Sequence, residues 1–168
     1  MKKLKPQAIK ILKMFHIFFA FSWIIGAVIL CLLVFIIYPV SGDELYMRSR
    51  ILQIVDDYFI IVGAIGCLFS GLIYSVFTNW SFFKHKWITL KWVLIILQTL
   101  FGTFVLGPCL NENVVIANKL RDVALTDAVF LDNLRITQIC GTIQTILLLL
   151  VIIISVQKPW KRKSNNTN

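Results

Sequence analysis

Acidic residues and histidines are scarce in this sequence. Among 168 residues, eight Asp and Glu stand against seventeen Lys and Arg, and histidine occurs twice. Four runs of 19 to 25 residues contain no Asp, Glu, Lys or Arg: Met14–Tyr38, Tyr58–Phe77, Trp92–Leu110 and Ile136–Gln157. An apolar run of ~18 residues is long enough to cross a membrane as a helix. With 58% hydrophobic residues, the composition is that of a membrane protein and not of an ordinary soluble domain.

Several catalytic and metal-binding motifs are also missing. The sequence has no Gly-rich phosphate loop, no HExxH pair and no nucleophile elbow. Two histidines and three methionines are too few for a copper pathway. The cysteines Cys31, Cys67, Cys109 and Cys140 form no CxxC pair and are expected to be small apolar fillers. Whether Cys109 and Cys140 form a disulfide is left open by the sequence.

The charge-free runs predict an all-α membrane protein whose single domain, residues 1–168, is a four-transmembrane-helix bundle. Lipid offers the backbone no hydrogen-bond partner, so each run must satisfy its own backbone as a helix. The first run exceeds the ~7–15-residue core of a signal peptide and is expected to be retained. The expected spans are 14–38, 56–78, 87–108 and 134–157, followed by a disordered basic tail at 159–168.

Turn signals and periodicity predict where these helices end. Tyr38-Pro39 is expected to end the first span and Gly107-Pro108 the third. Residues 114–134 carry apolar side chains at roughly helical spacing, which predicts an outer helical extension leading into the fourth span. Asp56 and Asp57 begin the second span, where an ion pair with Arg135 at the start of the fourth is expected to be within reach.

Basic residues are divided unequally between the two sides of the predicted bundle. Twelve Lys and Arg, and no acid, lie in the N-terminal lead, the connection between the second and third spans, and the C-terminal tail. Because Lys and Arg are enriched in cytoplasmic loops, both termini are predicted to be cytoplasmic. The net charge of +9 is therefore a topology signal. Membrane lipid is the expected partner, and no nucleic acid is expected.

His16 is the only histidine inside a charge-free run, and it shares a helix face with Trp23. Ionisable residues within spans are rare and are functional candidates by default. A neutral imidazole is a good axial ligand for haem iron, and a histidine that only hydrogen-bonds to a neighbouring helix is the alternative. Lys91 has a similar predicted depth, where it either extends to the membrane surface or serves as a second ligand or propionate partner. His85 is the alternative second ligand, although an exposed interfacial histidine is the favoured interpretation.

Small residues recur at every fourth position of the second span: Gly63, Cys67, Gly71 and Ser75. Such a strip lets another helix, or a flat ligand, approach the backbone closely. Plain helix packing is favoured over a cofactor face. If a porphyrin were present, the strip Gly63, Cys67 and Gly71 would admit its ring, with Trp23 packing nearby.

Two short motifs carry a resemblance to a known family. Lys13, His16, Trp23 and Gly26 resemble the first helix of the HemJ/CopD-like group of small four-helix bacterial membrane proteins. The stretch Trp87-Ile-Thr-Leu-Lys91 resembles the W-x-x-x-K at the start of the third helix of HemJ-type proteins. The resemblance implies a bacterial cytoplasmic membrane protein that binds haem b, with His16 and Lys91 as the functional pair. The activity of that family is the oxidation of protoporphyrinogen IX.

Together with the resemblance, the sequence predicts a haem b-binding membrane protein that binds, sequesters or confers tolerance to haem, and whether it is also an enzyme is left open. His16 is the expected axial ligand, and Lys91 the second ligand or propionate partner. A HemJ-like protoporphyrinogen oxidase is the alternative, and a cofactor-free membrane scaffold or partner subunit is a third hypothesis. Assembly into a homo-oligomer is left open.

Overall fold

The computed structural model describes residues 4–77 and 86–157, and every regular element in these ranges is helical. The first long helix is α1 (Pro6–Ile36). The second consists of α2 (Gly42–Val55), the π-helical turn η1 (Asp56–Ile61) and α3 (Val62–Phe77). The third consists of α4 (Lys86–Phe101), the π-helical turn η2 (Gly102–Leu106), α5 (Gly107–Leu120) and the 3-10 turn η3 (Arg121–Thr126). The fourth is α6 (Ala128–Gln157).

All four long helices are long and apolar enough to cross a membrane. This confirms the prediction of an all-helical chain with four membrane-length helices, as in a multi-pass membrane protein. The outer surface of the helices is rich in large apolar side chains, including Phe18 (64% exposed) and Phe104 (72% exposed). Such a surface would be unfavourable in water and is suited to contact with lipid.

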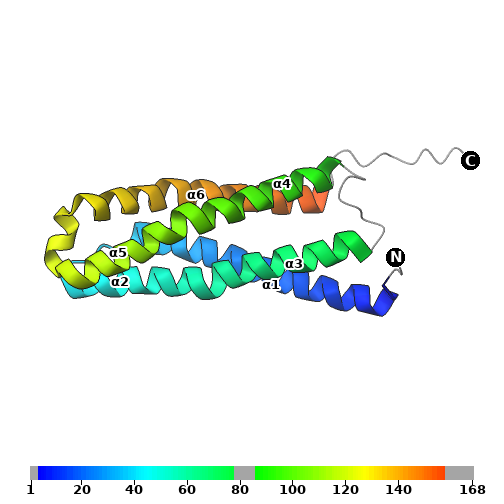
Figure 1. Cartoon of the computed structure of the whole chain (residues 1–168), viewed down its shortest axis with the longest axis horizontal. Helices are drawn as coiled ribbons and strands as arrows, with labels where there is room; N and C mark the ends of the chain where they lie inside the picture. The colour runs from blue at the N-terminus through cyan, green and yellow to red at the C-terminus, as the bar shows by residue number, and fades with distance from the viewer. Residues whose placement is uncertain (1–3, 78–85, 158–168) are drawn as a thin grey trace, which may run out of the picture.

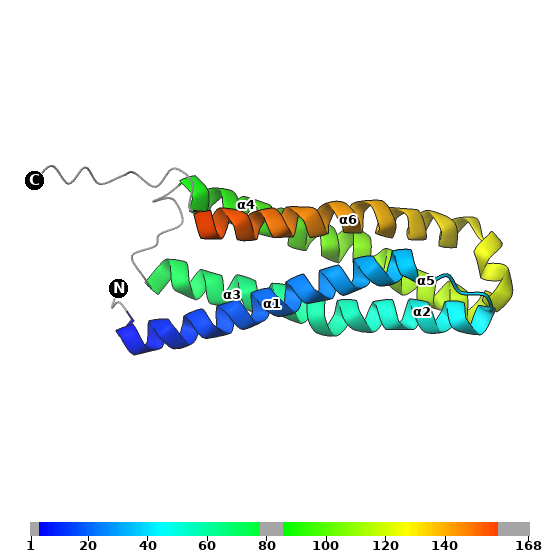
Figure 2. The same ribbon diagram turned by 180° about the vertical axis from the view of Figure 1, so that it is seen from behind.

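The helices lie side by side and antiparallel along the long axis of the molecule (Figure 1). Helix α1 packs along α3, α4 packs along α6, and α2 packs along α5. The described chain begins and ends at one end of the bundle, where the Leu4 N–H donates to the Phe77 carbonyl (3.3 Å). The connections from α1 to α2 and from α5 to α6 lie at the opposite end (Figure 2). Helices α3 and α4 follow one another in the chain but make little direct contact.

Three small residues set the close packing of α1 against the second long helix. A Cβ atom added to Gly63 would lie 2.6 Å from the Trp23 backbone nitrogen, and one added to Gly66 would lie 2.3 Å from the Phe19 ring. On α1, a Cβ atom at Gly26 would lie 2.8 Å from Phe59 Cβ. Glycine is therefore required at these contacts, as in other membrane helix pairs that approach through small residues.

The second and third long helices extend well past the spans expected from hydropathy. At 36 and 41 residues they are longer than the first, which has 31. A 36-residue helix is ~54 Å long, well beyond the ~30 Å of a bilayer core. Helices α2 and α5, and the start of α6, therefore form a more polar helical extension of the bundle.

The third helix does not end at Gly107-Pro108, contrary to the sequence-based expectation. Proline removes a backbone donor and its ring collides with the preceding turn of an α-helix. Here the preceding turn is the π-helical η2, in which the Gly107 N–H donates to the Gly102 carbonyl. The wider turn accommodates Pro108, and the helix continues to Leu120.

The helical extension expected over residues 114–134 is present but not continuous, because α5 ends at Leu120 and α6 begins at Ala128. The α-helical part of the third helix ends at Leu120, and the chain turns through η3, which begins at Arg121 with a positive φ of 47°. The Arg121 guanidinium pairs with Asp43 (3.1 Å) and lies 4.5 Å from the centroid of the Tyr46 ring. Two contacts with α2 thus hold this strained turn against the start of the second helix.

The expected ion pair between Arg135 and Asp56 or Asp57 is not formed. Arg135 lies instead on the exposed face of α6, where its Nη1 is 3.9 Å from Asp132 of the same helix. The arginine that sequence reasoning missed is Arg48, which is buried in α2 and donates to the Ile37 carbonyl (2.9 Å). It satisfies a carbonyl at the C-terminus of α1, where positive charge is favoured.

Candidate functional site

Two cavities lie along the sparsely packed interface between α3 and α4. The first, here the His16 cavity, has a volume of about 240 Å³ and is lined by α1, α3 and α4. The second, here the Gln98 cavity, has a volume of about 360 Å³ and is lined by all four long helices. No residue lines both cavities, and the buried side chains Trp23, Ala64 and Leu148 of the second pack in one cluster with Cys67 of the first. The two cavities are therefore separate sites.

The His16 cavity brings together most of the residues that the sequence selected. Four of the six lie in its wall: His16, Lys91, Cys67 and Gly71. The sequence alone could not show that the two ionisable side chains share a site, and the packing of α1 and α4 around α3 places them there. The remaining lining residues are Lys13, Ile17, Leu68, Tyr74, Ser75, Trp87, Ile88, Trp92 and Ile95.

The hydrogen bonds around His16 favour the tautomer that carries its proton on Nδ1. His16 Nδ1 lies 2.9 Å from the Ser70 hydroxyl oxygen. That hydroxyl donates its proton to the Gly66 carbonyl (2.6 Å), so its oxygen accepts a hydrogen bond from Nδ1–H. In a neutral imidazole the other nitrogen, Nε2, then carries the lone pair. Cys67 Sγ lies 3.9 Å from both ring nitrogens, which makes a long and weak contact with each.

Lys91 lies on α4, opposite the helices that carry His16 and Ser70, and is half-buried. Its Nζ is 6.0 Å from the centroid of the Trp87 ring, one turn earlier in the same helix. Across residues 4–77 and 86–157, no carboxylate lies within ion-pair distance of Lys91. Lys13 on α1 also lines the cavity, and the described lining contains no Asp or Glu. Among the described residues, the site therefore contains two lysines and no acid that would balance their charge.

The other two selected residues lie elsewhere. Gly63 packs directly against the α1 backbone, because an added Cβ would lie only 2.6 Å from Trp23 N. The expectation that Gly63 admits a porphyrin ring is therefore wrong. Trp23 is buried and lines the Gln98 cavity instead of the His16 cavity. Gly71 differs from Gly63, since a Cβ atom there would make only ordinary contact with the His16 ring, at 3.5 Å. His85 lies outside the described residues.

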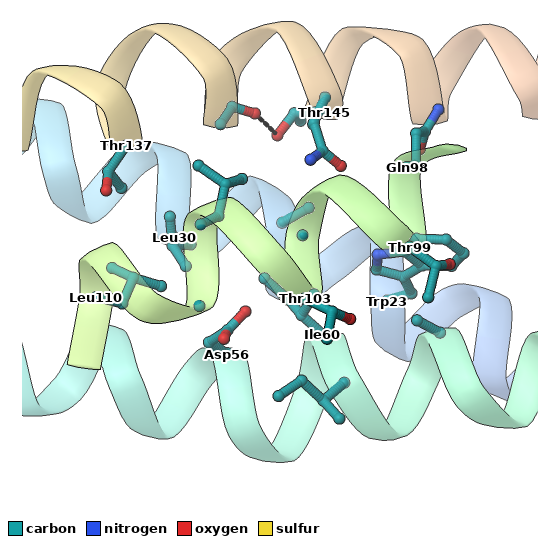
Figure 3. Close-up of a pocket in the computed structure, with 18 of the residues that line it drawn as sticks. Trp23, Leu30, Asp56, Ile60, Gln98, Thr99, Thr103, Leu110, Thr137 and Thr145 are labelled. Carbon is teal, nitrogen blue, oxygen red and sulfur yellow. Dashed lines mark hydrogen bonds between the residues drawn. The ribbon is translucent and has the colours of Figure 1, made fainter. Parts of the chain in front are cut away.

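The Gln98 cavity is a site that the sequence-based reasoning missed. Figure 3 shows side chains from all four long helices around it, including Trp23, Asp56, Gln98 and Thr145. Ionisable residues are the strongest sign of a site in a membrane helix, whereas this cavity is polar mainly through amides and hydroxyls. The sequence does contain a sign of this site. Polar Gln-Thr pairs occur within the third and fourth charge-free runs, at 98–99 and 144–145.

Both π-helical turns contribute to the wall of the Gln98 cavity. Asp56, Ile60 and Ile61 come from η1, and Gly102 and Thr103 come from η2. A π-helical turn adds one residue to the helical repeat and is frequently found at functional sites. Here the two turns face one cavity from opposite helices.

Gly141 provides a test of the space in this cavity. It lines the cavity within α6, and a Cβ atom added there would meet no atom within 4 Å. Alanine is favoured over glycine within a helix by up to about 1 kcal/mol. We expect Gly141→Ala to raise the unfolding free energy by about that amount in a detergent titration. A loss of stability would mean that the cavity does not have the space described.

All four cysteines are free thiols, including Cys109 and Cys140. Across residues 4–77 and 86–157, no three His, Cys, Asp or Glu side chains converge as a metal-ion site. His16 is thus a lone imidazole beside lysines in the described part of the chain. The chain matches no protein-family model, and it has no significant match among curated proteins or solved structures.

Proposed function

We propose that this protein binds haem b in the membrane through the His16 cavity and serves in haem handling: binding, sequestration or tolerance. The observation that carries the proposal is the arrangement of His16, whose Nδ1 is bonded to Ser70 while Nε2 is left as the nitrogen able to ligate iron. Metal-binding histidines almost always use their second nitrogen in such a hydrogen bond. The resemblance of the His16 and Lys91 motifs to HemJ/CopD-like proteins supports the same ligand.

The charge of the cavity suits a ligand that carries carboxylates. Lys13 and Lys91 line it from different helices, and no acid among the described residues of the wall opposes them. The propionates of haem b would find an ammonium partner there, and Lys91 is the candidate for that role or for a second iron ligand. Trp87, Trp92 and Ile95 provide apolar wall for the ring. Bound haem would supply an iron centre, and the chain would supply its ligand, its charge partners and its apolar surroundings.

The size of the cavity constrains how a porphyrin could be held. Sites that enclose drug-sized organic ligands have volumes of ~300–1,000 Å³, and this cavity has about 240 Å³. It would therefore enclose part of the ring, with the remaining edge toward lipid near the exposed Ile17. The described lining holds one imidazole and no carboxylate for proton transfer, which favours haem handling over protoporphyrinogen oxidation.

Titration with hemin tests the proposal. The purified full-length chain in detergent is expected to shift the Soret band of added hemin, and His16→Ala is expected to abolish the shift. His85→Ala tests the alternative ligand and is expected to keep the shift, whereas loss of the shift in this variant would assign the iron to His85. Size-exclusion chromatography of each variant checks folding. An equal shift in folded His16→Ala would refute the ligand assignment.

Lys91→Gln separates the two roles proposed for Lys91. If the ammonium pairs with a propionate, the variant should weaken hemin affinity while leaving the Soret position unchanged. If Lys91 is an iron ligand, the position of the band itself should move. No change in either quantity would exclude Lys91 from the site.

We also propose that both termini are cytoplasmic and that the membrane is the bacterial cell membrane. The described ends of the chain and the start of α4 lie at one end of the bundle (Figure 1), which agrees with the excess of basic residues predicted for that side. A reporter that is active only outside the cytoplasm is expected to be silent when fused to the C-terminus. Fused within the turn at residues 121–127, it is expected to be active, and the reverse pattern would contradict the orientation.

A further inference from the structure

The Gln98 cavity contains amide groups whose donors have no partner within the described part of the chain. Gln98 is buried, with 5% of its surface exposed, and its side-chain Nε2 makes no hydrogen bond to residues 4–77 or 86–157. The Nε2 of Gln144, on α6, is likewise buried and unpartnered among these residues. A buried donor left unsatisfied costs about 1–3 kcal/mol. Two such groups in one cavity therefore indicate an acceptor that the described helices do not provide.

No other polar group of the described residues lies in hydrogen-bonding position to either amide nitrogen. The hydroxyls of Thr99, Thr137 and Thr145 donate to carbonyls of their own helices, at 2.8–2.9 Å. Asp56 lies at the end of the cavity away from Gln98 (Figure 3). Among the described residues, no Lys, Arg or His lines the cavity. An anion would thus meet a carboxylate and no cation, so the acceptor at Gln98 is expected to be neutral.

The shape and position of the cavity indicate how the ligand arrives. Its volume of about 360 Å³ lies within the ~300–1,000 Å³ range of small-molecule sites. Ile61 and Ile65, which are 42% and 48% exposed, form part of its wall, so the cavity reaches the lipid-facing surface of the bundle. The Trp23 ring lines it as a flat aromatic surface. A ligand would enter from the membrane.

We propose that the Gln98 cavity binds a neutral, membrane-soluble ligand through its carbonyl oxygens, which accept from the amides of Gln98 and Gln144. Two sources of that chemistry exist in a membrane: the head group of a quinone and the ester groups of a phospholipid. The site shares no lining residue with the His16 cavity, and the proposal does not depend on haem binding.

Binding of menadione, a compact quinone, tests the proposal. The full-length chain is placed in nanodiscs of diether phosphatidylcholine, which has no ester carbonyls, and menadione is titrated against tryptophan fluorescence. Saturable quenching is expected in the wild type and is expected to be lost in Trp23→Phe. Gln98→Leu and Gln144→Leu should each weaken the affinity about three- to tenfold, the effect of one hydrogen bond. The matched control is Gln138→Leu, which lies on α6 outside the cavity and should keep the wild-type affinity.

The outcomes are distinguishable. Absence of saturable quenching would overturn the proposal, as would wild-type affinity in a Gln98→Leu variant that folds normally. If the amides are only unsatisfied structural groups, Gln98→Leu should raise thermal stability and leave menadione affinity unchanged. A repeat in ester-linked phosphatidylcholine identifies the source. Equal affinity in both lipids supports a quinone site, and loss of menadione binding in the ester lipid supports a site for phospholipid esters.

Discussion

Ser70→Ala is expected to weaken hemin affinity by about 10- to 100-fold, the usual effect of removing the partner of a metal-ligating histidine. Ser70 is buried, and its hydroxyl is the group that accepts from His16 Nδ1–H at 2.9 Å while donating to the Gly66 carbonyl. Without it, the ring loses the contact that sets both its orientation and its tautomer. The affinity is measured by titrating hemin into the full-length chain in detergent.

The matched control for this variant is Ser22→Ala. Ser22 also donates a side-chain hydrogen bond across helices, to the Phe59 carbonyl at 3.2 Å, but does not line the His16 cavity. Its substitution should leave hemin affinity unchanged. If Ser70→Ala binds hemin as tightly as the wild type while His16→Ala does not bind, then Ser70 does not orient the ligand, and the proposed role of the Ser70 hydrogen bond is refuted.

The part of the fold that could be predicted from sequence is the part that lipid determines. Runs such as Met14–Tyr38 contain no charge, and a backbone in lipid has few alternatives to a helix. Hydropathy does not predict how the chain folds where the helices extend beyond the membrane. It therefore missed the continuation of the third helix past Pro108, which depends on a π-helical turn. It also missed the reversal at Arg121, which depends on contacts with Asp43 and Tyr46 of α2.

The sequence could identify only those site residues that are rare in membrane helices. His16 and Lys91 are conspicuous because ionisable residues are costly in a membrane helix, and both do line one cavity. Spacing alone could not show which small residues of the second span pack against a helix and which line a cavity. Gly63 and Gly71 are eight residues apart, yet one faces the backbone of α1 and the other faces a cavity. The difference arises because α1 diverges from α3 and is a property of packing, not of sequence pattern.

Gly63→Ala is expected to lower the unfolding free energy by about 2 kcal/mol. Its new Cβ would lie 2.6 Å from Trp23 N and 2.9 Å from the Phe19 carbonyl oxygen. Both are backbone atoms of α1, so no side-chain rotation relieves the contact and the helix itself must move. Overpacking of this kind costs about 1–3 kcal/mol, and the higher helix propensity of alanine offsets up to about 1 kcal/mol.

The same substitution at Gly71 is the internal control, because its nearest neighbour would be the His16 ring at 3.5 Å, an ordinary contact. Gly71→Ala should be neutral or stabilising in the same denaturation experiment. Equal effects at the two positions would contradict the close packing of α1 on α3. Because that packing also places His16 beside Ser70, Gly63→Ala should weaken hemin binding as well, although Gly63 lies outside the His16 cavity. A destabilised variant with undiminished hemin affinity would show that the cavity forms independently of the α1–α3 contact.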